Sequence, residues 1–220
     1  MTKFNAFWVE KTDEGVNHKI IERTVDDLPS GEVLVNVKYS SLNYKDALSA
    51  TGMPGVTKRY PHTPGIDAAG EVVESSSSLF NAGDEVISVG FDLGMNTPGG
   101  YGQLIRVPAA WLTPLPKGMT VRASMAIGTA GLTAALCYDK LLQMGAEPSN
   151  GPVIVTGATG GVGSVSVSLL ASAGFDVVAS SGKTNKVDYL KSLGAKEVIN
   201  RDSISKETGR PLDVMKYAHG

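Results

Sequence analysis

The sequence predicts an α/β plus β fold, in which an all-β module is followed by a parallel sheet of alternating strands and helices. Up to Val107, short apolar runs are separated by turn residues, which is typical of a β module. Beyond Pro152, short apolar runs alternate with stretches of helical periodicity, which indicates a parallel sheet. A chain of 220 residues can form two small domains, and we expect them at residues 1–121 and 122–220.

Composition and charge exclude several classes of partner. The 20 Lys and Arg residues nearly balance the 22 Asp and Glu residues, and no basic run is long enough for a nucleic-acid or membrane patch. Cys137 is the only cysteine, so an internal disulfide is impossible, and residues 1–15 lack the apolar core of a signal peptide. We therefore expect a soluble cytoplasmic protein whose partners include neither nucleic acid nor membrane.

In the β module, each expected strand is a short apolar run that ends in turn residues such as Gly, Pro, Asn and Asp. The expected strands are Ala6–Val9, Glu32–Tyr39, Gly70–Val73, Glu85–Val89 and Gly102–Val107. The polar run Ser75–Ser78 is expected to be a solvated hairpin loop.

A change of character after Pro116 marks the second domain. Residues Val121–Met144 carry Ala, Leu and Met at helical spacing without proline, which predicts a helix pair. The expected elements that follow are a strand Pro152–Thr156, a helix through Ala173, a strand Asp176–Ser180, a helix around Lys186–Leu193 and a strand Glu197–Asn200.

A glycine loop joins the first of these strands to the helix after it. Residues 157–163 match the G-x-G-x-x-G pattern at Gly160 and Gly163, with Ala158 at the position of the first glycine. Glycine lets a pyrophosphate approach the backbone, and the helix start offers unpaired N–H groups. The pattern predicts the first half, β-α-β-α-β, of a Rossmann dinucleotide-binding domain, although a turn needed only for packing is the alternative. The expected contacts are Thr159, Gly160, Gly161, Val162 and Gly163.

The end of the second strand of this domain indicates which dinucleotide binds. An NAD-binding protein places Asp or Glu there for the ribose 2′-hydroxyl, whereas this chain has Ser181, Gly182 and Lys183. Hydroxyl and ammonium donors suit a 2′-phosphate, so we expect NADPH as the cofactor. Arg201, just past the third strand, can reach the same end of the cofactor. Lys183 and Arg201 can also be ordinary exposed residues of their loops.

Several motifs in one order carry a resemblance to a known family. They are Asn43-Tyr-Lys-Asp46, Pro64-Gly-Ile-Asp-Ala-Ala-Gly70, Gly83-Asp-Glu-Val86, Gly128-Thr-Ala-Gly-Leu-Thr-Ala-Ala135, Val155 to Gly163, and Tyr189-Leu-Lys-Ser-Leu-Gly-Ala195. With these motifs the chain resembles the medium-chain dehydrogenase/reductase family, in its zinc-free quinone-oxidoreductase branch, and is similar to acrylyl-CoA reductases. The resemblance implies that the β module is a GroES-like β-barrel domain.

The residues argue against a metal site. Zinc alcohol dehydrogenases of this family carry a Gly-His-Glu motif, where this chain has Gly65-Ile66-Asp67, and their four-cysteine lobe is absent. Tetrahedral zinc needs three or four converging ligands. Only His18, His62 and His219 are available as histidines, and His62, between prolines, is expected to be a structured turn residue.

The resemblance implies reduction of an activated carbon–carbon double bond in a small molecule, either an unsaturated acyl-CoA such as acrylyl-CoA or a quinone or enone. Tyr44 is then a candidate catalytic and cofactor-binding residue, as proton donor or only as a positioning group. Asn43 can donate to the enolate oxygen or hold its loop, and Asp46 is expected to orient that loop. Thr129 can bond the nicotinamide carboxamide or cap a helix.

Family members continue well beyond residue 220, so the resemblance implies a chain that ends after three strands of a six-stranded sheet. Residues 212–220 do not continue the family pattern into a fourth strand. We consider a truncated reductase of low activity, a homodimer in which a second copy covers the open edge, and a non-catalytic NADPH-binding sensor or remnant.

Overall fold

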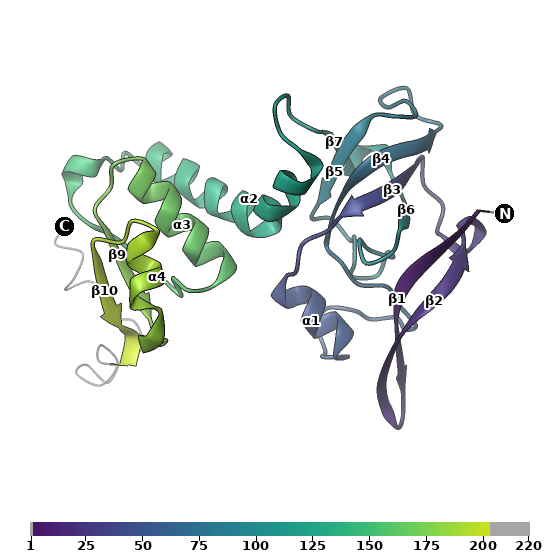
Figure 1. Ribbon diagram of the computed structural model, residues 1–220, viewed down its shortest axis with the longest axis horizontal. Helices are drawn as coiled ribbons and strands as arrows, with labels where there is room; N and C mark the ends of the chain where they lie inside the picture. The colour runs from purple at the N-terminus through teal and green to yellow at the C-terminus, as the bar shows by residue number, and fades with distance from the viewer. Residues whose placement is uncertain (1, 203–220) are drawn as a thin grey trace. The chain divides into compact units, whose positions relative to one another are not determined.

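The computed structural model describes residues 2–202 of the chain. They belong to two compact units, which divide between Thr129 and Ala130 (Figure 1). The expected domain boundary near residue 121 coincides with the start of helix α2 (Val121–Gln143), whereas the compact units divide within that helix. Within the described range, no helix is both long and apolar enough to cross a lipid bilayer.

The first unit is built on an antiparallel five-stranded sheet in the order β6-β3-β4-β5-β7. Its strands are β3 (Val33–Tyr39), β4 (Asp67–Ser75), β5 (Glu85–Val89), β6 (Leu104–Val107) and β7 (Thr113–Pro114). Valine and isoleucine side chains from these strands form the main core of the unit, together with Leu93 and Leu112 from the segments that follow β5 and β6. The register places Asp67, the first residue of β4, opposite Val89, the last residue of β5. The sheet therefore brings these two positions to one end.

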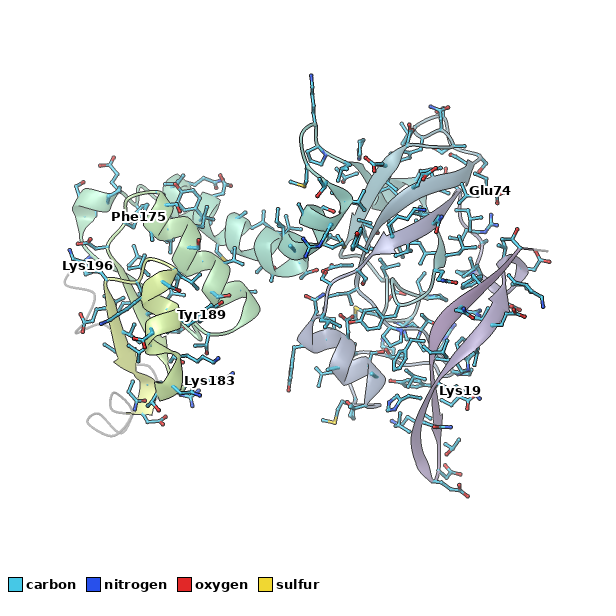
Figure 2. All side chains as sticks on the ribbon, in the orientation of Figure 1. Lys19, Glu74, Phe175, Lys183, Tyr189 and Lys196 are labelled. Carbon is cyan, nitrogen blue, oxygen red and sulfur yellow. The ribbon has the colours of Figure 1, made fainter. Side chains whose placement is uncertain are left out.

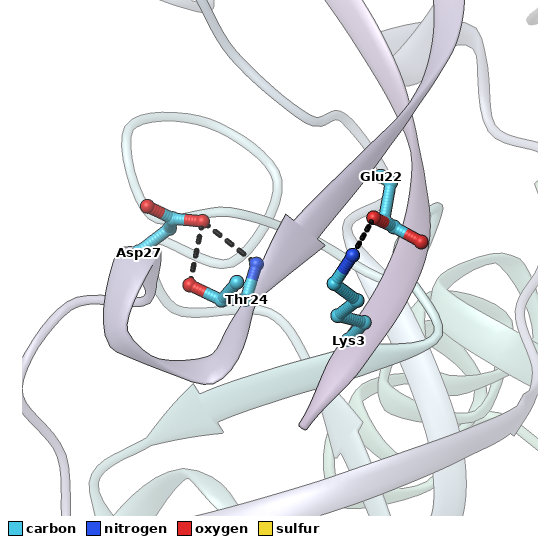
Figure 3. Close-up of polar contacts among 4 residues, drawn as sticks. All are labelled: Lys3, Glu22, Thr24 and Asp27. Carbon is cyan, nitrogen blue, oxygen red and sulfur yellow. Dashed lines mark hydrogen bonds and ion pairs between the residues drawn. The ribbon is translucent and has the colours of Figure 1, made fainter. Parts of the chain in front are cut away.

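A long antiparallel hairpin of β1 (Lys3–Thr12) and β2 (Gly15–Thr24) forms a separate two-stranded sheet. The sequence predicted only Ala6–Val9 of it. The prediction missed β2 because most of its side chains are exposed, so apolar and polar residues do not alternate. Figure 3 shows two polar contacts that hold the hairpin and the turn after it: Lys3 Nζ donates to Glu22 Oε1 at 2.7 Å, and the Asp27 carboxylate accepts from Thr24.

The prediction of a loop around Tyr44 and Asp46 was wrong, because helix α1 (Tyr44–Ala50) occupies this segment. Its seven residues are too few to show a helical period in the sequence. The start is fixed by Asp46, whose carboxylate accepts the N–H of Asn43, the residue before the helix, at 2.9 Å. Short one-turn 3-10 helices at Val25–Asp27 and Ala109–Trp111 were also not predicted.

The predicted helix pair at Val121–Met144 is confirmed. Helix α2 consists of two helical segments joined at Gly128, whose backbone (φ 50°, ψ −157°) is not helical. A side chain at this position would be strained, and its Cβ would lie 2.7 Å from Oδ2 of Asp67. Glycine therefore allows α2 to bend close to the start of β4.

The second unit contains a parallel sheet, as predicted, and its strands lie in the order β10-β9-β8. Its elements are η3 (Pro148–Asn150), β8 (Val153–Thr156), α3 (Gly161–Ser172), β9 (Val177–Ser181), η4 (Thr184–Lys186), α4 (Val187–Ser192) and β10 (Glu197–Asn200). Side chains of α3 and α4, among them Val167 and Leu190, pack with Val155 and Val177 in one core on a single face of the sheet. The partial Rossmann fold is confirmed.

Candidate active site

The glycine loop places the start of α3 at the carboxyl end of β8. Gly157 adopts a positive φ of 60°, and the N–H of Gly160 donates to the Gly157 carbonyl at 2.9 Å, closing a tight turn. The N–H groups of the first turn, at Gly161, Val162 and Gly163, have no acceptor within the helix. No acidic side chain lies in this first turn. The backbone therefore presents donors and the positive helix end, which suits an anion.

The glycines of this loop have different structural roles. A Cβ on Gly163 would lie 2.4 Å from the Gly157 carbonyl oxygen, so glycine is required there for the helix to pack on the loop. A Cβ on Gly160 would meet only that same oxygen, at 3.3 Å. Packing thus explains Gly163 fully but explains Gly160 only weakly, which leaves room for a ligand at Gly160.

The end of β9 lies beside this loop. Ser181 is buried, its Oγ accepts the N–H of Lys183 at 3.0 Å, and it lies 3.3 Å from Oγ1 of Thr159. These contacts join the glycine loop to the turn after β9. The Lys183 side chain is exposed, and Figure 2 shows it at the end of the sheet where β10 also ends.

Arg201 adds a second cation to this group. A Cβ on Gly182 would lie 2.9 Å from Nη2 of Arg201, so the guanidinium group lies directly over this glycine. Arg201 also forms an ion pair with Asp202, with Nε and Oδ1 3.6 Å apart, but both side chains are largely exposed. An exposed pair of this kind stabilises the fold little, so a phosphate group can compete for the arginine.

A second cluster, in the first unit, surrounds the carboxylate of Asp67. This residue is completely buried, and its carboxylate accepts hydrogen bonds from the Asn43 amide at 2.9 Å and from the Thr129 N–H at 2.9 Å and hydroxyl at 2.5 Å. The hydroxyl of Ser41 donates to it as well. Neutral donors therefore replace the water that the buried charge loses.

The buried carboxylate of Asp46 holds the same segment from the other side. Its Oδ1 accepts the Ile66 N–H at 2.9 Å, and its Oδ2 accepts the Asn43 N–H at 2.9 Å and the Tyr101 hydroxyl at 3.1 Å. Burial raises the pKa of the Tyr101 phenol above its usual value, and the nearby Asp46 carboxylate raises it further. Tyr101 therefore stays protonated as a donor. These are the contacts of a residue that orients the segment.

The predicted residues of the first unit differ in what their side chains do. Asn43 and Thr129 lie together at Asp67, where the Asn43 amide holds its segment and the Thr129 hydroxyl donates to the carboxylate. The Tyr44 side chain is 82% exposed, and no hydrogen bond of its hydroxyl is found within residues 2–202. Tyr44 is therefore accessible to a ligand.

The chain is similar to known oxidoreductases. Residues 29–117 match the family model for the alcohol dehydrogenase GroES-like domain. Acrylyl-CoA reductase AcuI of Ruegeria pomeroyi is 45% identical over 212 residues, which are 96% of this chain and 64% of that protein. The putative quinone oxidoreductase YhfP of Bacillus subtilis is 44% identical over 216 residues, 98% of this chain and 66% of that protein. A crystal structure of YhfP holds NAD.

A solved structure confirms that the likeness extends to the fold. The yhdH oxidoreductase of Salmonella enterica, crystallised with NADP, superimposes with a TM-score of 0.89 at 44% identity, over 90% of this chain and 61% of that chain. The chain belongs to the medium-chain dehydrogenase/reductase family. It spans slightly less than two thirds of the length of these relatives.

In this member of the family, the position of the zinc-binding histidine is held by Ile66, a buried side chain without a ligand atom. Within residues 2–202, no three His, Cys, Asp or Glu side chains are grouped so that they could hold a metal ion. His62 is buried, bridges to Val9, and donates from Nε2 to the Gly94 carbonyl at 2.9 Å. His219 and residues 212–220 lie outside the described residues, and the absence of zinc stays a prediction.

Sequence reasoning did not identify Asp67 as the centre of this cluster. It noted the residue only as a departure from the Gly-His-Glu motif. The available signal was an acidic residue at the start of an apolar run, Asp67-Ala68-Ala69, because an Asp that the strand buries must find hydrogen-bond donors.

Proposed function

We propose that this chain binds NADPH and takes part in the reduction of an activated carbon–carbon double bond. The observation that carries the proposal is the group of donors at the end of β9. There Ser181, Lys183 and Arg201 surround the position where an NAD-binding protein would place a carboxylate for the ribose hydroxyl. Their hydroxyl and cationic groups match the charge of a 2′-phosphate.

The described residues fit the rest of the dinucleotide as well. The N–H groups of Gly161, Val162 and Gly163 and the bare backbone at Gly160 would hold the pyrophosphate. The hydroxyl of Thr159 contacts Ser181 and so couples the pyrophosphate side of the site to the adenosine side. Crystal structures of relatives from Salmonella enterica and Escherichia coli with NADP or NADPH support this cofactor.

When bound, NADPH supplies a hydride to an electrophilic carbon. The protein then has to stabilise negative charge on the carbonyl oxygen of the substrate and provide a proton. Asn43 uses its side-chain amide to donate to Asp67 and keeps a second N–H, which can donate to that oxygen. Tyr44, with its exposed hydroxyl, is the candidate for donating the proton or for positioning the cofactor. The network of Asp46 and Asp67 fixes both residues.

The substrate is a small molecule, and we favour an unsaturated acyl-CoA such as acrylyl-CoA. Relatives named as acrylyl-CoA reductases, at 45% and 46% identity, support this choice. A quinone or enone is the second candidate, which the similarity to a putative quinone oxidoreductase favours. We also propose that the protein is zinc-independent, cytoplasmic and a homodimer.

Cofactor titration tests the proposal. We expect the chain to bind NADPH at least about tenfold more tightly than NADH, as one charge-assisted phosphate contact is worth about 1.5–3 kcal/mol. Lys183→Ala and Arg201→Ala should each reduce this preference by weakening NADPH alone. The matched control is Lys196→Ala, which removes an exposed lysine paired with Asp176 at the start of β10 (Figure 2). Equal affinity for the two cofactors would refute the proposal.

Turnover separates the catalytic role from a sensor. If the chain is a reductase, oxidation of NADPH should depend on acrylyl-CoA or on a quinone, and Tyr44→Phe should slow it. Unchanged NADPH affinity of this variant would favour proton donation by Tyr44, and weaker NADPH affinity would favour positioning of the cofactor. Tight NADPH binding without turnover on either substrate would instead favour the sensor.

A further inference from the structure

Phe91, just beyond β5, has an unusual backbone. Within residues 2–202 it is the one residue other than glycine with a positive φ, 57°. This conformation is unfavourable for a large side chain and persists only where surrounding structure enforces it. The ring is nevertheless 57% exposed, so burial of the ring does not compensate for the strain.

The surroundings hold Phe91 in place from both sides. Its ring stacks on Trp111, with ring centroids 5.3 Å apart and planes at 6°, and Trp111 in turn packs against the main core of the first unit. The next residue, Asp92, accepts from Asn96 Nδ2 at 2.9 Å and from Thr97 Oγ1 at 3.1 Å, which fixes the turn. Trp111 is thus the inner ring, and Phe91 is the outer ring with an open face.

The register of the sheet relates this pair to the candidate active site. Asp67 lies opposite Val89, and Phe91 follows Val89 by two residues along the chain. Phe91 therefore lies at the end of the sheet where Asp67 and its donors lie. An exposed aromatic ring, rigidly held at that end, is suited to contact a ligand.

We propose that Phe91 is a stacking platform for a flat conjugated ring of the substrate, which makes it a specificity-determining residue. The inference rests on the proposed function for the nature of the substrate. Two sources can supply such a ring: the quinone itself, or the adenine of coenzyme A. Both would stack on the open face of Phe91, supported from behind by Trp111.

Ligand affinity of Phe91→Leu tests this role, because leucine keeps an apolar side chain but removes the ring. Calorimetry with 1,4-naphthoquinone, acrylyl-CoA and acrylyl-pantetheine gives the affinities, and Trp111 emission in a Trp8→Phe background gives an independent optical signal. Loss of one aromatic stack should weaken binding of the ring-bearing ligand about 2- to 10-fold. NADPH affinity should not change. Tyr189→Leu, which removes a partly exposed ring from α4, is the matched control.

The three ligands separate the possible results. Weaker binding of naphthoquinone supports stacking of a quinone ring. Weaker binding of acrylyl-CoA with unchanged acrylyl-pantetheine supports stacking of adenine. Unchanged affinity for all three, or an equal loss for the two acrylyl compounds with naphthoquinone unchanged, would overturn the inference. Failure of the proposed function would show separately, as absence of NADPH preference in the unmodified chain.

Discussion

At the residue scale, the carboxylate of Asp67 organises the first cluster. It is completely buried and depends on four neutral donors, from Ser41, Asn43 and Thr129, to replace water. Removing the charge while keeping the shape should therefore be costly. Asp67→Asn replaces one carboxylate oxygen with an NH₂ group. This group is a donor, but its neighbours at this site are also donors, so the hydrogen bonds to that oxygen are lost. We expect a loss of about 2–3 kcal/mol in the free energy of unfolding, measured by urea denaturation.

The control for this prediction is Asp27→Asn. Asp27 also accepts two hydrogen bonds, from the N–H of Thr24 at 2.7 Å and its hydroxyl at 3.0 Å, but it is exposed to water (Figure 3). The two substitutions change the same functional group, so burial is the main difference between them. If Asp67→Asn is no more destabilising than Asp27→Asn, the carboxylate is not the centre of the cluster.

His62 should make the stability of the chain depend on pH. Burial lowers its pKa below the usual 6.5, and the Gly94 carbonyl and Asp92 carboxylate only partly oppose this. The unfolded chain then binds a proton more readily than the folded chain, so stability is full above about pH 6.5 and falls as the pH drops below that value.

Thermal unfolding of the unmodified chain and of His62→Gln, between about pH 7 and pH 5, measures this effect. Glutamine can still donate to the Gly94 carbonyl but does not titrate. The variant should lose less stability than the unmodified chain over this range. Parallel pH curves for the unmodified chain and for His62→Gln would contradict the prediction.

Sequence reasoning identified residues better where function depends on the backbone than where it depends on burial. Gly160, Gly163 and Ser181 could be proposed from the sequence because a phosphate site needs bare backbone and donors after particular strands, and their role in binding stays a prediction. Asp67 was missed as the centre of its cluster because its importance comes from segments distant in the sequence, at Asn43 and Thr129, that only the folded chain brings together.

At the element scale, the glycine loop allows packing to be separated from ligand binding. A Cβ on Gly163 would overlap the Gly157 carbonyl oxygen, at 2.4 Å, whereas a Cβ on Gly160 would lie 3.3 Å from it. Gly163→Ala should therefore lower the unfolding midpoint. Gly160→Ala, with an ordinary φ of −80°, should leave it nearly unchanged and weaken NADPH binding about tenfold.

Thermal unfolding and NADPH titration of both variants test whether packing and ligand binding depend on different glycines. The two variants are well matched because both substitutions add the same methyl group within one turn of chain. If Gly160→Ala bound NADPH as tightly as the unmodified chain, the loop would serve packing alone.

The elements that were predicted well are those with a strong local pattern. Strands β5 and β10 have the predicted bounds because each is a short apolar run between turn residues. Strand β2 and helix α1 were missed because their pattern is weak: most side chains of β2 are exposed, and α1 has only seven residues. The start of α1 depends on Asp46, to which sequence reasoning assigned the role of orienting a loop.

At the scale of the whole molecule, an apolar face of α2 remains exposed. Leu132 and Leu136, one helical turn apart, are 46% and 60% exposed. A hollow of about 450 Å³ beside them is lined by Thr133, Leu136, Cys137, Lys140 and Leu141. In the described part of the second unit, strand β8 has a neighbour only in β9, so its other edge is unpaired. Exposed apolar surface and an open strand edge favour self-association.

We therefore expect light scattering to give twice the mass of one chain at micromolar concentration. Leu136→Glu should shift the protein towards the monomer, because a charge would be buried in the apolar contact. Ile20→Glu is the matched control, since Ile20 is 67% exposed but lies on strand β2 of the other unit. If Leu136→Glu still has the mass of a dimer, the interface does not include this apolar face. A monomer at all concentrations would show that this apolar face does not drive self-association, despite its exposure.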